Sequence, residues 1–235
     1  MRKGIIYNLG RVLVQRVPGF RSLVILLWRA IGSHKFRGAY QNACAAGDVK
    51  LHIGAGTTRL DGWLNTDILP NGELFLDATR HFPVQNNSVH YIFCEHFVEH
   101  VPRRAVIKFF KESFRVLHPK GVLRISTPDI EAHVREYLNR SERMHLLLKR
   151  NRQHGYFYSR YPVDILNKTF YEDNHVCLYD AEALEEMLHS VGFKDIIRFE
   201  VGESRHAALS GIERHDVGPI TDKFMLVLEA KKPLA

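Results

Sequence analysis

The sequence has no acidic residue before Asp48, although 26 aspartates and glutamates follow in the rest of the chain. Residues 1–47 carry eight lysines and arginines, so the formal net charge of +7 comes from this leader. A positive charge confined to one end does not provide a nucleic-acid-binding face over the whole chain, and we predict no nucleic-acid partner.

Cysteine is scarce. Its three positions, Cys44, Cys94 and Cys177, are far apart and form no Cys-x-x-Cys pair. This spacing argues against a disulfide scaffold or a zinc ribbon and fits a reduced cytosolic protein. The apolar run of the leader, residues 23–28, is far shorter than the roughly 20 residues that a membrane span needs. Arginines also interrupt the region where a secretory signal would need its apolar core, so we expect a cytoplasmic location.

The leader predicts two helices separated by Pro18-Gly19, the second beginning at Phe20 and reaching Ile31. Two interpretations stay open. Apolar faces flanked by arginines suit peripheral contact of residues 1–35 with the anionic inner face of a membrane. Alternatively, the helices pack on the rest of the chain or on a partner subunit.

Residues 48–235 have the pattern of one α/β domain. Alternating apolar residues over 49–53 run into Gly54 and Gly56, which predicts a buried strand ending in a turn that a ligand can approach closely. Further strands are predicted at 62–67, 74–78, 89–95, 121–128, 195–200 and 224–230, with helices at 104–117 and 181–191. Strands that alternate with helices form a parallel sheet, which binds ligands at the carboxyl ends of its strands.

Acidic residues close the second and third predicted strands, at Asp67 and Asp77. A carboxylate at the end of the second strand suits the two hydroxyls of a ribose. A dinucleotide is disfavoured, because Arg59 stands where the fingerprint needs a third glycine. Asp67 also follows Gly56 after 11 residues, whereas the acid of an NAD site follows after roughly 20. We therefore predict a nucleoside ligand without a pyrophosphate.

Several motifs, taken together in this order, resemble class I S-adenosylmethionine-dependent methyltransferases. The resemblance is strongest to small bacterial methyltransferases associated with cell-surface polysaccharide biosynthesis. It implies a Rossmann-like, mostly parallel seven-stranded sheet with an antiparallel last strand and helices on both faces. The motifs are Leu51–Gly56, Asp67, Asp77-Ala78, Glu95–Val101, Phe114–Gly121 and Thr127–Asp129.

The resemblance also implies a cofactor site for S-adenosylmethionine. The methionine part would meet the glycine turn, the ribose and adenine would meet the acids of strands two and three, and the sulfonium would lie at the end of strand four. The residues in that order are Gly54, Ala55 and Gly56; Asp67; Asp77 and Ala78; Glu95 and His96. The link over 57–62 is too short for a crossover helix, so the leader or a second subunit of a homo-oligomer would cover the gap.

Histidines follow the fourth predicted strand. His96, Glu99 and His100 lie one helical turn apart, and His175 resembles the further histidine that some metal-dependent class I methyltransferases supply from downstream. These four are candidate ligands of a divalent metal ion. We favour the alternative, a hydrogen-bonded helix start without metal. For the base that deprotonates an acceptor, His100 is the first candidate and His175 the second.

Residues 130–178 read as a cap inserted over the active site, and a basic, amphipathic helix is predicted there around Glu131–Arg152. Aromatic residues at 156–161 and 169–171 suit stacking on sugar faces, with Arg160 facing an anionic group, or they build the core of the cap itself. We predict O-methylation of a sugar or glycolipid hydroxyl. Two alternatives stay open: a non-catalytic methyltransferase-like binding subunit, and an N- or carboxyl-methyltransferase acting on a small metabolite or a peptide.

Overall fold

The structure is a computed structural model that describes residues 20–70, 72–155, 159–172, 174–214 and 218–234. The predicted helix near the start of the leader and the aromatic residues 156–158 lie outside these ranges. Within them, no helix is both long enough and apolar enough to cross a membrane.

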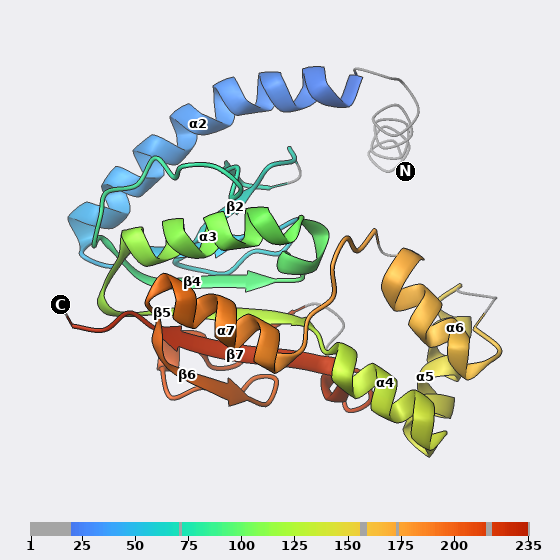
Figure 1. Ribbon diagram of the computed structural model, residues 1–235. Helices are drawn as coiled ribbons and strands as arrows, with labels where there is room; N and C mark the ends of the chain where they lie inside the picture. The colour runs from blue at the N-terminus through green and yellow to red at the C-terminus, as the bar shows by residue number, and fades with distance from the viewer. Residues whose placement is uncertain (1–19, 71, 156–158, 173, 215–217, 235) are drawn as a thin grey trace.

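Seven strands form one sheet in the order β3-β2-β1-β4-β5-β7-β6 (Figure 1). The first five strands pair in parallel, and β7 runs antiparallel to both of its neighbours. This order confirms the predicted mostly parallel α/β sheet with an antiparallel last strand. The strands are β1 (Lys50–Ile53), β2 (Leu64–Asp67), β3 (Leu74–Phe75), β4 (Val89–Glu95), β5 (Leu117–Pro128), β6 (Lys194–Phe199) and β7 (Met225–Lys231).

Three helices contribute to the main core: α2 (Phe20–Ala46), α3 (Arg103–Val116) and α7 (Ala181–Val191). Phe36 of α2, Phe109 of α3 and Leu188 of α7 are buried in the same apolar cluster. The long helix α2 lies against β3 and β2. Gly32 makes this approach possible, because a Cβ there would lie only 2.5 Å from the Cβ of Phe75.

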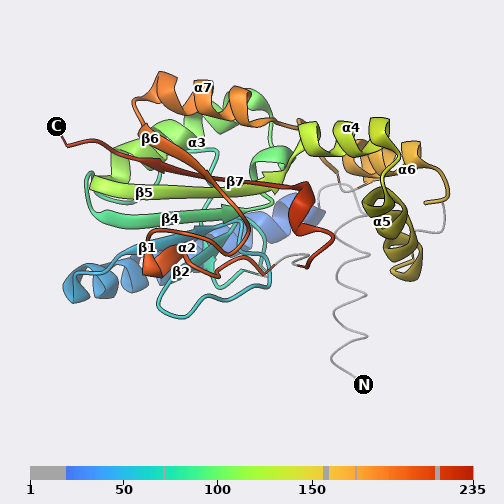
Figure 2. The same ribbon diagram turned by 90° about the horizontal axis from the view of Figure 1, so that it is seen from below.

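The predicted short link between β1 and β2 contains turns and no helix. The space beside it is filled from a distant part of the sequence. Leu60 of the link packs with Phe93 of β4, and so do Leu209 and Ile212. The last two residues lie in the β6–β7 connection, which includes the short helix η3 (Ala207–Leu209) (Figure 2). The sequence-based expectation of cover by the leader or a second subunit missed this segment.

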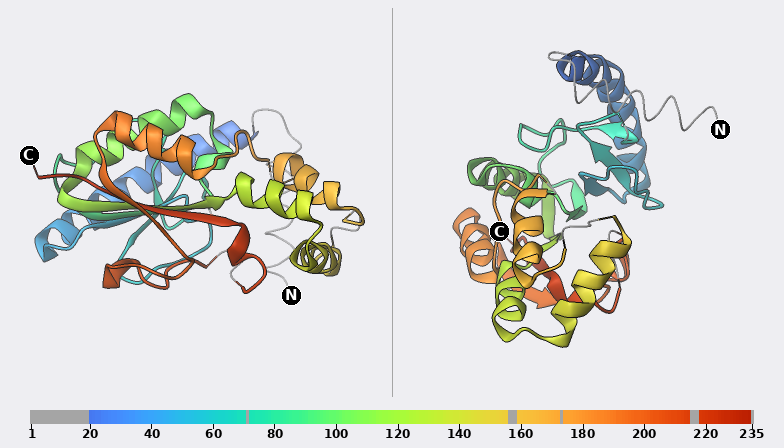
Figure 3. Two further views of the ribbon diagram at one scale, coloured as in Figure 1. Left: turned by 60° about the horizontal axis from the view of Figure 1, so that its bottom comes forward. Right: turned by 90° about the vertical axis from the view of Figure 1, so that its right-hand side faces the viewer.

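The cap at the carboxyl end of the sheet contains α4 (Ile130–Asn139), α5 (Glu142–Gln153), α6 (Pro162–Asn167) and the π-helical turn η2 (Lys168–Glu172) (Figures 1 and 3). We expected a single helix near 131–152, and this was wrong. Arg140 adopts a left-handed conformation with φ of 51°. The side chain of Ser141 then caps the next helix by accepting from the amide of Met144. The left-handed backbone at Arg140 therefore ends α4, and the cap at Ser141 begins α5.

The cap has its own small core. Met144, Leu148 and Ile165 pack with Phe224 of η4 (Asp222–Phe224), a turn that directly precedes β7. Tyr137 of α4 packs against this core, whereas Phe170 is 41% exposed, Tyr161 67% and Tyr171 77%.

Candidate functional site

The glycine turn and Asp67 meet at the carboxyl ends of β1 and β2. Gly54 and Gly56 have φ values of 68° and 54°, in the region that favours glycine. The amide of Gly56 donates to Oδ2 of Asp67 at 2.9 Å, and the amide of Leu69 donates to Oδ1 at 2.7 Å. The buried Ala55 is tied to β2 by its amide, which donates to the carbonyl of Thr66. The carboxylate of Asp67 therefore fixes the shape of the turn.

The acid predicted to close the third strand lies just beyond β3. Oδ1 of Asp77 accepts from the amide of Thr79 at 3.0 Å and from its hydroxyl at 2.6 Å. Oδ2 pairs with Arg80 at 2.9 Å. Ala78 is buried beside it. The predicted strand over 74–78 is wrong in length, because β3 ends at Phe75. Asp77 thus belongs to the turn that leaves the sheet, with its carboxylate held by that turn.

Glu95 and His96 stand at the end of β4. The carboxylate of Glu95 is buried and accepts from the amide of Arg214, at 3.2 Å to Oε1 and 3.1 Å to Oε2. His96 has φ of 49°, which is uncommon for a residue other than glycine. Such backbone strain persists where the surrounding structure fixes it. Here Nδ1 of His96 lies 2.7 Å from Oε1 of Glu99, so the ring is held by a carboxylate.

Glu99 is the centre of this end of the sheet. Its side chain is fully buried, and its second oxygen accepts from the hydroxyl of Thr127 on β5 at 2.9 Å. Burial alone would raise the pKa of Glu99, but the hydrogen bond and charge of His96 outweigh it and hold this pKa below its usual value. The backbone carbonyl of Glu99 accepts from the amides of Val176 and Cys177, which ties the end of the cap to the short helix η1 (Val98–His100) that follows β4.

The structure brings three of the four candidate ligands together. Single ligand atoms of His96, Glu99 and His175 all lie within 4.8 Å of one another, in the part of the chain that is described. Nδ1 of His175 contacts the carbonyl of Thr169 at 2.5 Å, so it carries the proton and Nε2 carries the lone pair. His100 is exposed and is not a member of this group, but its ring lies edge-on to His175 at 4.9 Å.

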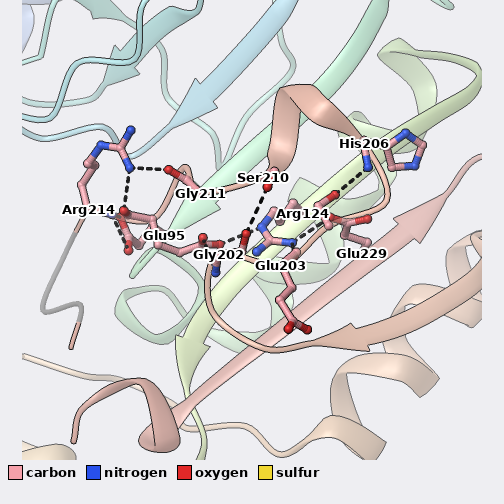
Figure 4. Close-up of polar contacts among 11 residues, drawn as sticks. Glu95, Arg124, Gly202, Glu203, His206, Ser210, Gly211, Arg214 and Glu229 are labelled. Carbon is pink, nitrogen blue, oxygen red and sulfur yellow. Dashed lines mark hydrogen bonds and ion pairs between the residues drawn. The ribbon is translucent and has the colours of Figure 1, made fainter. Parts of the chain in front are cut away.

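From the sequence we expect the linker over 204–222, which holds Glu213 and Arg214, to reach the substrate pocket, and the main chain of Arg214 does contact Glu95. Figure 4 shows Arg214 and Glu95 in contact. The sequences of β5 and β7 contain an indication of this arrangement. Arg124 and Glu229 interrupt apolar strands with opposite charges, and the antiparallel register of β5 and β7 places them opposite each other.

The residues at this edge fit the S-adenosylmethionine that the resemblance implies. A Cβ built on Gly56 would have no heavy atom within 4 Å, so the backbone of the turn faces open space. Carboxylates stand at the ends of β2 and β4, where they can accept from ribose hydroxyls and neutralise a cation. These carboxylate acceptors therefore suit a positively charged nucleoside.

Solved structures similar to this one include two methyltransferases. A SAM-dependent methyltransferase from Archaeoglobus fulgidus has 14% identity and a TM-score of 0.48, over 87% of this chain and 100% of the other. A SAM-dependent methyltransferase from Thermotoga maritima, described as a possible histamine N-methyltransferase, has 16% identity and a TM-score of 0.48, over 94% and 98%. These distant likenesses carry no conclusion about the acceptor.

Comparison with curated proteins finds no significant match. A family model described as a methyltransferase domain matches residues 64–197, which is more than half of the 235 residues. The match contains Asp67, Asp77, the end of β4 and the whole cap. The chain therefore belongs to the methyltransferase domain family and is an S-adenosylmethionine-dependent enzyme.

Proposed function

We propose that this enzyme methylates a hydroxyl group of a sugar or glycolipid. The observation that carries the proposal is the cluster of His96, Glu99 and His175 at the end of β4. A hydroxyl must lose its proton when it is methylated, so it needs a base, whereas a carboxylate acceptor is already deprotonated. A histidine imidazole at this end of the sheet is suited to that task.

The cofactor contacts are proposed on the same geometry. Gly54, Ala55 and Gly56 would line the methionine part with backbone atoms, and Asp67 would accept from the ribose hydroxyls. Asp77 and Ala78 would meet the adenine, and Glu95 and His96 would flank the sulfonium. When bound, S-adenosylmethionine supplies an electrophilic methyl group. The chain itself aligns the acceptor oxygen and takes up its proton.

His175 and His100 are the candidate bases. The hydrogen bond from Nδ1 of His175 to Thr169 supports His175 as the proton acceptor, because it leaves the lone pair on Nε2. The ring of His100 lies edge-on to that of His175, with the two ring centroids 4.9 Å apart, so both candidate bases occupy the same part of the site.

A metal-assisted form of the same reaction has one observation in its favour. His96, Glu99 and His175 offer two imidazoles and a carboxylate within 4.8 Å, a donor set that suits a divalent transition metal. Such an ion would bind the acceptor hydroxyl and lower its pKa. A strong chelator should then abolish methyl transfer, and added Mn²⁺ or Mg²⁺ should restore it. Full activity in the metal-free enzyme would leave the histidine base as the mechanism.

Features outside the cluster support the acceptor class and the location. The rings of Phe170 and Tyr171 are exposed on the cap, as a carbohydrate-stacking surface requires. The leader without acids supports peripheral contact with an anionic membrane through residues 1–35, and the helix α2 also exposes Leu27 and Ile31. Pelleting with anionic vesicles, with and without residues 1–35, tests this contact.

The decisive experiment incubates the enzyme with methyl-labelled S-adenosylmethionine and separate glycan, lipid and peptide extracts. Label in base-stable ethers of the glycan or lipid fraction supports the proposal. Label confined to peptides, amines or base-labile esters would overturn it. His100→Ala and His175→Ala should lose turnover with little change in cofactor affinity. His189→Ala, on α7, provides a matched control and should keep full turnover.

A further inference from the structure

The first part of the β6–β7 connection, residues 200–214, is a closed loop laid over one face of the sheet. The amide of Gly211 donates to the carbonyl of Gly202 at 2.9 Å and closes the loop at its base. Leu209 and Ile212 anchor it by packing with Phe93 of β4. The loop is therefore fixed beside the strand that ends in Glu95.

A buried arginine holds the end of this connection. Arg124 of β5 is fully buried, and its Nε donates to Oε1 of Glu213 at 2.7 Å. Its Nη1 donates to Oε1 of Glu229 on β7 at 2.7 Å and to the carbonyl of Glu203 at 2.8 Å (Figure 4). Oε2 of Glu213 accepts from the amide of Gly202 at 3.1 Å. Glu213 thus joins the loop to the sheet, whereas Glu229 belongs to the sheet already.

The residue after Glu213 reaches the active end of β4. The amide of Arg214 donates to both oxygens of Glu95, at 3.2 and 3.1 Å. A main-chain donor on a carboxylate favours its ionised form and fixes the direction of its oxygens. Because adjacent residues cannot move independently, the pairing of Glu213 with Arg124 determines where the amide of Arg214 lies.

We infer that Arg124 and Glu213 are positioning residues that hold the carboxylate of Glu95 in place for the cofactor's positive charge. This inference rests on the proposed function, which puts Glu95 beside the sulfonium. S-adenosylmethionine carries that charge, and the product S-adenosylhomocysteine has lost it. A fixed, ionised carboxylate therefore favours the methyl donor over the product, and this preference is the property that the loop controls.

The test compares Glu213→Ala with Glu229→Ala. Both substitutions remove one of the two carboxylates that pair with Arg124 at 2.7 Å, so both leave the arginine one carboxylate partner. Only Glu213 carries the loop that contacts Glu95. Calorimetric titration with S-adenosylmethionine and with S-adenosylhomocysteine should show about tenfold weaker binding of the methyl donor by Glu213→Ala, with product affinity nearly unchanged. Glu229→Ala should keep the wild-type ratio of the two affinities.

Further variants separate the possible failures. Glu95→Gln should lower the same ratio, and thermal unfolding shows that each variant is folded. If Glu213→Ala does not fold, Glu213→Gln replaces it, because its amide keeps an oxygen for Arg124 but turns an NH2 group toward the donor of Gly202. A normal ratio in the Glu213 variant, or an equal loss in Glu229→Ala, overturns the positioning role. Failure of the wild-type protein to bind S-adenosylmethionine overturns the proposed function itself.

Discussion

Replacing Glu99 should lower the free energy of unfolding, by an amount that depends on whether His96 and Thr127 keep an acceptor for their hydrogen bonds. In Glu99→Ala, Nδ1 of His96 and the hydroxyl of Thr127 both lose an acceptor that now lies 2.7 and 2.9 Å away. Breaking a buried ionic contact in this way costs roughly 3–5 kcal/mol. In Glu99→Gln the amide can still face both partners, so only the charge is lost, and we expect about 1–2 kcal/mol.

The difference in free energy of unfolding between the wild-type protein and Glu99→Gln should also depend on pH. The folded pKa of Glu99 lies below its usual value of 4.5, because the hydrogen bond and charge of His96 outweigh the effect of burial. A carboxyl whose folded pKa is lowered stabilises the fold above its unfolded pKa, and loses that contribution as pH falls through the folded pKa. The stability gap should therefore be present at neutral pH and shrink below about pH 4.5.

Urea unfolding at neutral pH and near pH 3.5 measures both effects, with thermal unfolding as a check at about 2–4 °C per kcal/mol for a chain of this size. Glu131→Gln serves as the control. Its carboxylate pairs with Arg135 on the exposed face of α4, with side-chain exposures of 59% and 54%. That pair should contribute less than about 1 kcal/mol. If Glu99→Ala were as stable as this control, or if the gap persisted at low pH, the reasoning would be refuted.

Three further predictions concern the glycine turn, two buried histidines and Asp67. Gly54 has φ of 68°, so Gly54→Ala should lower the free energy of unfolding by about 1–2 kcal/mol. Gly38→Ala, in α2 with open space around it, should raise the free energy of unfolding slightly. Thermal unfolding compares the two variants. Burial lowers the pKa of His52 and of His133 to about 4. The unfolded chain protonates both histidines below about pH 6.5, so the free energy of unfolding should fall as the pH is lowered from there toward pH 4. In His52→Gln the midpoint of urea unfolding should depend less steeply on pH. Asp67→Asn turns an NH2 group toward one of two main-chain donors, so calorimetry should show about tenfold weaker binding of S-adenosylmethionine.

The parts of the site that the sequence predicted are those made by neighbouring residues. A strand that ends in glycine, or in an acid, places that residue at the carboxyl edge of a parallel sheet whatever the remaining chain does. For this reason Gly56 and Asp67, predicted independently, meet through a hydrogen bond of 2.9 Å. The same reasoning brought His96 and Glu99 together, since residues three apart share a face of one turn.

The parts that the sequence did not predict depend on contacts across long separations. Leu209 and Ile212 show no strand or helix periodicity, so nothing local identifies them as the cover of the gap beside β1. The amide of Arg214 has no sequence signal either, because every non-proline residue carries one. Its importance comes from reaching Glu95, which lies 119 positions away in the chain.

The matched family range and the loop that contacts Glu95 lie in different parts of the chain. The family model covers residues 64–197, which include Asp67, Glu95 and the cap. The β6–β7 connection follows this range, so Arg214 lies outside it. The carboxylate at the end of β4 is thus oriented by a segment outside the matched residues. Substitutions in 200–214 should therefore change how this enzyme discriminates between methyl donor and product, while leaving the sheet that defines the family intact.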